Sequence, residues 1–263
     1  MLTHLRLAGS LAVLGAMLAY SPVAFAQVNS QSNKPAENAN TQDGSPALSH
    51  DLSGVWMQYR DGDVPGTPGM NGVNERFRPP LTPWGQAQVN AAKPLSGAKA
   101  VAGKEDNSAL RCEPSGPPQV LVLPNPWEIV QIPGRVLMFF EEQHVWREIW
   151  TDGRPLPKDA TPQWNGYSIA RWEGDTLVVE SSGFNGKAWL DYAGHPTTES
   201  LQVIERFQRH DFGHMDVTAT ITDPGAYTKP WSYTQSLTLV VDDELMEEVC
   251  ENRKDLEHIR ARK

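Results

Sequence analysis

The sequence predicts an all-β protein, built as an antiparallel up-and-down β-barrel with one or two short helices. The first indication is a run of short segments between residues 119 and 250 in which apolar and polar side chains alternate, as they do in strands with one buried face. The second is turn chemistry at the joints, as in Ile132–Arg135 (IPGR), Thr151–Pro155 (TDGRP) and Trp172–Thr176 (WEGDT). Strands joined in sequence by tight turns form a meander, which we expect to curl and close because closure removes exposed edges.

The expected strands are short and closely spaced. Alternation is clearest in His214–Thr222, where every second residue is apolar. The stretch RVLMFF (Arg135–Phe140) is apolar on both faces instead, which predicts a cover on its outer side. The expected strands are Ser53–Arg60, Gln119–Leu123, Trp127–Ile132, Arg135–Glu142, His144–Thr151, Tyr167–Trp172, Thr176–Ser181, Leu201–His210, His214–Thr222, Ser232–Val241 and Glu244–Cys250.

Two helices are expected beside the strands. The first covers Leu81–Lys93, because Thr82 suits the N-cap and Pro83 suits the first helical position. This helix is the candidate cover for the outer side of Arg135–Glu142. The second is a charged terminal helix over Lys254–Lys263.

The chain divides into three parts. Residues 1–26 have the pattern of a secretory signal, with Arg6 before the apolar run Leu7–Tyr20 and a small-residue cleavage site at Ala24–Ala26. Residues 27–50 are rich in Asn, Gln, Ser and Pro and are expected to form a flexible linker. Residues 51–263 suit a single barrel domain. We therefore expect a periplasmic or secreted protein.

The charge balance excludes some partners. The chain holds 23 Lys+Arg and 32 Asp+Glu, and removal of the signal takes only Arg6, which leaves 22 against 32, or −10. Nucleic acids and anionic membrane surfaces need a basic face, so neither is expected as a partner. No Gly-x-Ser-x-Gly elbow, phosphate loop or dinucleotide fingerprint occurs in the sequence. No cofactor is therefore expected, and the predicted partner is a small-molecule ligand or substrate.

The chain has two cysteines, Cys112 and Cys250. In an oxidising compartment such a pair is typical of a disulfide, and the alternative is two buried thiols. A metal site is not expected, because neither cysteine has a close Cys partner. His210, Asp211 and His214 span a turn without a recognised zinc spacing, so a structural turn is the favoured interpretation there.

The segment Phe139–Trp150 (FFEEQHVWREIW) carries the candidate catalytic residues. Glu141 and His144 flank an expected hairpin, where the carboxylate would orient the imidazole as a general base. Arg147 would lie within reach of the same face and would stabilise negative charge there. The alternative is an ion cluster at strand ends with no role in chemistry.

Candidate substrate-binding residues come from three features. Trp146, Trp150 and Trp164 are candidates for a stacking platform for a ring-bearing ligand, and core packing is the alternative. The residues Asp191 and His195 lie in a long connection that could close over a barrel mouth, or Asp191 simply caps a turn and His195 is solvated.

Glu205 and Arg206 are the third feature. They fall on opposite faces of one strand, so one of them is expected to reach the interior and pair with Arg147 or Glu141. A surface role for both is the alternative.

These motifs together resemble a family of exported bacterial proteins without a settled activity. The matching stretches are EEQHVWREIWTDGRPLP (141–157), WNGYS (164–168), WEGDTLVV (172–179), WLDYAGHP (189–196) and ERFQR (205–209). The resemblance covers about Cys112 to Asn252 and implies an exported barrel-like domain. The chain departs from the family at Thr197-Thr198, where members often carry His-Ser. In addition, Gly54-x-Trp56 is similar to the start of lipocalin-type (calycin) barrels.

Three functions remain open from the sequence. The first is a cofactor-independent acid–base enzyme, an isomerase, lyase or hydrolase, acting on a small, partly apolar or ring-bearing molecule. The second is a non-catalytic periplasmic protein that binds such a molecule. The third is a structural or interaction module whose charges only connect the strands.

Overall fold

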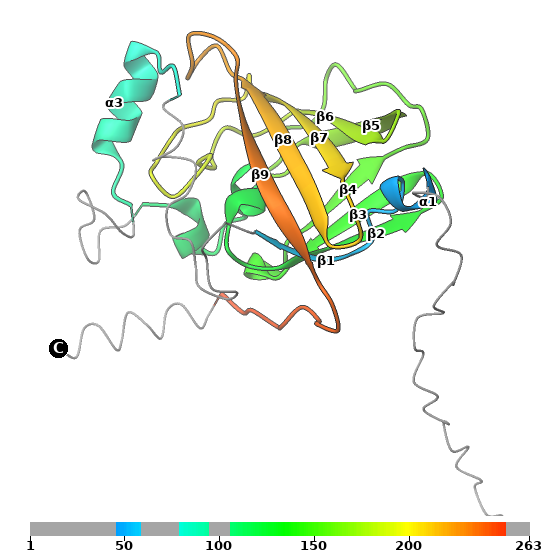
Figure 1. Ribbon diagram of the computed structural model, residues 1–263. Coiled ribbons are helices and arrows are strands. Elements are labelled where there is room, and N and C mark those ends of the chain that lie inside the picture. The colour runs from blue at the N-terminus through cyan, green and yellow to red at the C-terminus, as the bar shows by residue number, and fades with distance from the viewer. Residues whose placement is uncertain (1–45, 59–78, 95–105, 251–263) are drawn as a thin grey trace, which may run out of the picture. The chain divides into compact units, whose positions relative to one another are not determined.

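The computed structural model describes residues 46–58, 79–94 and 106–250. In this part of the chain nine strands close into one barrel in sequence order (Figure 1), which confirms the predicted fold class. The strands are β1 (Gly54–Gln58), β2 (Trp127–Ile132), β3 (Arg135–Phe140), β4 (Trp146–Trp150), β5 (Tyr167–Glu173), β6 (Thr176–Ser182), β7 (Gln202–Arg209), β8 (His214–Thr222) and β9 (Trp231–Val240). The helices are α1 (Pro46–Ser49), α3 (Pro83–Ala91) and the 3-10 turns η1 (Ser108–Arg111), η2 (Gln119–Val122) and η3 (Glu142–His144).

The barrel is antiparallel except at one seam. β1 closes the barrel against β9, with Val55 opposite Val240. β4 and β5 instead pair in parallel, through Ile149 opposite Ser168 and Trp150 opposite Ile169. The expectation of a fully antiparallel barrel is wrong here because residues 151–166 form a crossover rather than a hairpin. A parallel pair needs a connection of about a dozen residues or more, and this segment provides it.

The interior of the barrel is packed with apolar side chains. Along β7 buried and exposed residues alternate without a break, as a period of two requires. Trp56, Trp127, Met138, Phe140, Phe207, Met215 and Leu237 belong to the larger buried cluster. A smaller buried cluster joins Phe184 and Leu190, from the β6–β7 connection, to Val203 of β7 and Ile221 of β8. This connection therefore packs onto one end of the barrel.

Two segments expected as strands are not strands. Gln119–Leu123 contains the 3-10 turn η2, whose four residues are all buried, and a short apolar run does not distinguish a buried turn from a strand. Residues 244–250 have no regular structure. Cys250, at their end, forms a disulfide with Cys112, with an S–S distance of 2.03 Å. The predicted disulfide is thus confirmed.

The α3 helix begins as predicted but covers a different surface. Thr82 Oγ1 accepts the backbone N–H of Gly85 at 3.0 Å, which confirms the N-cap. The helix packs on the β8–β9 connection, since a Cβ at Gly85 would lie 2.4 Å from the carbonyl oxygen of Ala226. The outer side of β3 is instead lined at Phe139 by Leu245 and Met246. The expected cover by α3 is therefore wrong.

Several predictions fall outside the described residues. They are the signal segment, most of the linker, the last two residues of the first expected strand and the terminal helix over Lys254–Lys263. Among the helices that the structure does describe, none has the length and apolar character needed to span a membrane.

Candidate functional site

Arg147 and Glu205 form an ion pair inside the barrel. Arg147 lies on β4 and Glu205 on β7, and their exposed fractions are 2% and 0%. Arg147 Nη1 donates to Glu205 Oε1 at 3.0 Å, and Nη2 donates to Oε2 at 2.5 Å. One residue of Glu205 and Arg206 is expected to reach the interior and pair with Arg147 or Glu141, and the structure shows that it is Glu205, paired with Arg147. Arg206 points outward and binds Glu173 at 3.1 Å, so it does not contribute to this interior site.

Two serines complete the surroundings of the buried guanidinium. Ser168 Oγ accepts from Arg147 Nε at 3.2 Å, and Ser181 Oγ accepts from Nη2 at 2.8 Å. The two hydroxyl groups lie 2.9 Å apart. Since a buried charge is stable only when it is paired and hydrogen-bonded, this network is well suited to hold strands β4 to β7 in one register. The expectation that Arg147 shares a surface with Glu141 and His144 is wrong, because its side chain points into the barrel.

Asp191 and His195 form a second buried pair, in the β6–β7 connection. Asp191 Oδ2 lies 2.7 Å from His195 Nδ1. Asp191 Oδ1 accepts the backbone N–H groups of Ala193 at 2.9 Å and of His195 at 3.3 Å. The exposed fractions of Asp191 and His195 are 0% and 7%. Asp191 therefore caps a turn of the connection, as its alternative interpretation predicted. The expectation of a solvated His195 is wrong, because this side chain is buried against Asp191.

Two buried tyrosines lie near these acidic groups. Tyr227 donates its hydroxyl hydrogen to the carbonyl oxygen of Pro196 at 2.9 Å. Burial raises the pKa of Tyr227 well above its usual value, and the charges of Asp191 and Asp223 raise it further. Burial likewise raises the pKa of Tyr233, with Glu205 as the next cause. Both hydroxyl groups therefore remain protonated in the folded barrel at neutral pH.

These pKa shifts predict a stability loss in alkali. Because the folded-state pKa of Tyr227 lies above its unfolded value of about 10, its stabilisation is fully present below pH ~10 and is lost as the pH rises further. Each such tyrosine makes the free energy of unfolding fall more steeply, by up to about 1.4 kcal/mol per pH unit. We expect Tyr227→Phe to flatten the fall of unfolding free energy between pH ~10 and ~12, measured by chemical denaturation. Tyr167→Phe, at a partly exposed tyrosine, is the control, and equal slopes for Tyr227→Phe and the wild type would contradict the prediction.

Glu141 and His144 line one pocket, of about 330 Å³, on the outer side of β2 and β3. They do not form the expected hydrogen bond with each other. Glu141 Oε2 accepts the backbone N–H of Met246 at 3.0 Å, and His144 Nδ1 lies 2.8 Å from the carbonyl oxygen of Glu248. The reason is local, since Gln143 and His144 have left-handed φ values of 59° and 52° and turn the imidazole toward the C-terminal segment. Glu141, His144 and Arg147 therefore do not come together in one acid–base site.

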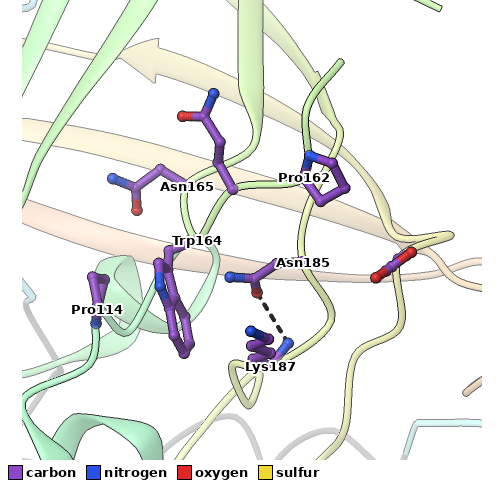
Figure 2. Close-up of a pocket in the computed structure, with 8 residues that line it drawn as sticks. Pro114, Pro162, Trp164, Asn165, Asn185 and Lys187 are labelled. Carbon is purple, nitrogen blue, oxygen red and sulfur yellow. Dashed lines mark hydrogen bonds between the residues drawn. The ribbon is translucent and has the colours of Figure 1, made fainter. Parts of the chain in front are cut away.

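Trp164 lines a larger pocket, of about 540 Å³. Figure 2 shows the side chains around it, which come from three loops distant in sequence. Its lining residues are Pro114, Pro162, Gln163, Trp164, Asn165, Asn185, Lys187 and Glu199. Backbone hydrogen bonds tie two of these loops together, from Gln163 N to Gly183 O and from Asn185 N to Gln163 O, both at 2.9 Å. These bonds hold the crossover loop against the β6–β7 connection, next to the parallel pair of strands β4 and β5.

The amides in the Trp164 pocket are held in different ways. Asn185 Oδ1 accepts the backbone N–H of Lys187 at 3.0 Å, the dashed line in Figure 2. Asn165 Nδ2 donates to the carbonyl oxygen of Trp146 at 3.0 Å. Asn165 Oδ1 is buried and has no hydrogen-bond partner within the described chain. A buried acceptor without a partner costs free energy, and this oxygen is closed off from the pocket by its burial.

The other two candidate tryptophans lie elsewhere. Trp150 is covered by guanidinium groups, with Arg154 at 3.4 Å and Arg135 at 4.6 Å from the ring centre. Trp146 lies on the outer face of β4 and is 56% exposed. Of the three, Trp164 is the one placed among the polar groups of the larger pocket.

The turn that contains His210, Asp211 and His214 is held by its own hydrogen bonds. Asp211 Oδ1 lies 2.9 Å from His214 Nδ1, and His210 Nε2 lies 2.9 Å from Asp216 Oδ2. The hydrogen bond with His214 lowers the pKa of Asp211. Within residues 46–58, 79–94 and 106–250, no three His, Cys, Asp or Glu side chains are arranged to hold a metal ion.

Sequence reasoning missed most of the residues around the Trp164 pocket, whereas five of the eight residues around the other pocket lie in the Phe139–Trp150 segment. Asn185 and Lys187 belong to no catalytic motif and reach Trp164 only through the folding of separate loops. A weak signal was the WNGYS stretch, which ends the crossover between β4 and β5 and begins β5. The chain matches no protein-family model, no curated protein and no solved structure.

Proposed function

We propose that the protein is an exported barrel that binds a small ring-bearing molecule of the carbohydrate class in the Trp164 pocket. The observation that carries the proposal is the combination, in one pocket of about 540 Å³, of an indole ring with amide, ammonium and carboxylate groups. This volume lies within the range of small-molecule sites, roughly 300–1,000 Å³.

The chemistry of the lining supports a polyhydroxylated ring. The indole of Trp164 offers a flat apolar face against which the C–H face of a sugar ring packs. Asn165 and Asn185 offer amide groups, and Lys187 and Glu199 offer a donor and an acceptor for hydroxyl groups.

Binding is favoured over acid–base catalysis by the arrangement of the candidate catalytic groups. Arg147 has Glu205, Ser168 and Ser181 as partners inside the barrel, and none of these lines the Trp164 pocket. Export rests on the signal pattern of residues 1–26, and the Cys112–Cys250 disulfide supports it because disulfides persist in oxidising compartments.

Trp164→Ala tests this proposal directly. Removal of the indole is expected to weaken sugar binding about tenfold or more, since it takes away both the packing surface and one wall of the pocket. Residues 27–263 would first be screened against a panel of mono- and disaccharides by thermal shift, because a ligand of the folded state raises the melting temperature. Isothermal titration calorimetry would then compare the wild type with the variant.

Trp84→Ala is the matched control, since Trp84 is 45% exposed on α3 and does not line the pocket. It should bind sugar as the wild type does. The proposal fails if no sugar in the panel shifts the melting temperature, or if both tryptophan variants bind with wild-type affinity.

A further inference from the structure

A second pocket lies on the outer side of β2 and β3 and shares no lining residue with the Trp164 pocket. Its volume is about 330 Å³, and it is closed on one side by the C-terminal segment. Its lining residues are Glu128, Phe139, Phe140, Glu141, His144, Val145, Leu245 and Met246. Glu128 and Phe139 stand directly opposite each other in the register of the two strands, so a carboxylate and an aromatic ring are neighbours there.

The charged groups of this pocket are acidic. No Lys or Arg side chain is among its lining residues. Within the described part of the chain, the Glu128 carboxylate forms no hydrogen bond or ion pair. Glu141 has one oxygen on the backbone N–H of Met246, which leaves its negative charge uncompensated by a cation. The pocket thus attracts positive charge.

The remaining surface of the pocket is apolar and partly aromatic. Phe139 contributes a ring, and Val145, Leu245 and Met246 contribute aliphatic and thioether groups. Aromatic faces attract cations through the ring quadrupole, and the apolar groups exclude a strongly hydrated metal ion or a sugar. Carboxylates and aromatic rings in one hollow are the combination that recognises alkylated ammonium groups.

We propose that this pocket binds a small organic ammonium compound with an apolar body. The cationic group lies between the carboxylates of Glu128 and Glu141 and beside the Phe139 ring. The apolar body lies against Val145, Leu245 and Met246. The volume of about 330 Å³ is at the lower end of the range for small-molecule sites, so the compound is small. This inference does not depend on sugar binding at Trp164.

The test compares a cation with a neutral molecule of nearly the same shape. Benzyltrimethylammonium and the N-oxide of benzyldimethylamine would be titrated into residues 27–263 by calorimetry. We expect the ammonium compound to bind at least about fivefold more tightly than the N-oxide, since only the cation gains from the carboxylates and the ring face. Equal affinities, or no binding of either compound, would overturn the proposal.

Two variants locate the binding. Glu128→Gln keeps the size of the side chain and removes the charge, and we expect it to weaken ammonium binding about fivefold. Glu247→Gln removes the same charge from an exposed residue that does not line the pocket, so it should leave the affinity within about twofold. Equal losses in the two variants would mean that only the overall charge attracts the ligand, and the pocket assignment would fail.

Two further arms identify the source of the ammonium and separate this site from the sugar site. Sedimentation with phosphatidylcholine vesicles, lost in Glu128→Gln, would assign the pocket to a lipid headgroup. Binding of the soluble compound alone would assign it to a free small molecule. Trp164→Ala should keep ammonium binding unchanged, so a failure of the sugar proposal and a failure of this one give different results.

Discussion

Glu205→Ala is expected to lower the free energy of unfolding by about 3–5 kcal/mol, because it leaves the guanidinium of Arg147 buried without a counter-ion. Arg147 is only 2% exposed and cannot reach solvent without opening the barrel. Its remaining partners, Ser168 and Ser181, are neutral hydroxyls. The melting temperature should fall by roughly 10 °C or more for a domain of this size, measured by calorimetry and by chemical denaturation.

Arg206→Ala is the matched control, since Arg206 is the next residue and points outward. Its ion pair with Glu173 is on the surface, and such pairs contribute at most about 1 kcal/mol. The double variant Arg147→Met with Glu205→Leu should recover much of the loss, because apolar replacement of a buried pair is often close to neutral. A Glu205→Ala protein as stable as Arg206→Ala would contradict the assignment of the pair to the barrel interior.

Removal of the Cys112–Cys250 disulfide is expected to have the second large effect. The bond joins residues separated by 138 positions, and closing so long a loop contributes up to about 5 kcal/mol in the chain-entropy model. The double variant Cys112→Ser, Cys250→Ser should therefore melt well below the wild type. The disulfide anchors residues 244–250, which supply Leu245 and Met246 to the ammonium pocket, so ammonium binding should weaken as well.

Reduction supplies the control for this experiment. The wild type treated with reductant should match the double serine variant in stability, while the variant should not respond to reductant. Equal stabilities of the oxidised wild type and the variant would show that the bond does not restrain the unfolded chain. Sugar binding at Trp164 provides a second readout, because none of the residues of the C-terminal segment lines that pocket.

The local features of the barrel could be predicted from the sequence because they depend on neighbouring residues. Strand alternation places Glu205 and Arg206 on opposite faces whatever their partners are. The N-cap at Thr82 requires only the three residues after it. Turn residues mark where strands end, which is enough to predict a barrel. The same reasoning misplaced Gln119–Leu123, since a buried apolar run suits a turn as well as a strand.

The sequence by itself therefore determined that alternate side chains of each strand share a face and that many short strands close on themselves. Only the tertiary structure decided which inward polar groups meet, as Arg147 does with Glu205 three strands away. It also decided the parallel seam of β4 and β5, because the path of residues 151–166 is set by packing rather than by local turn chemistry. The tertiary structure likewise decided which residues line each of the two pockets. Trp164 meets Asn185 and Glu199, and Glu128 meets Met246, only after barrel closure brings distant loops together.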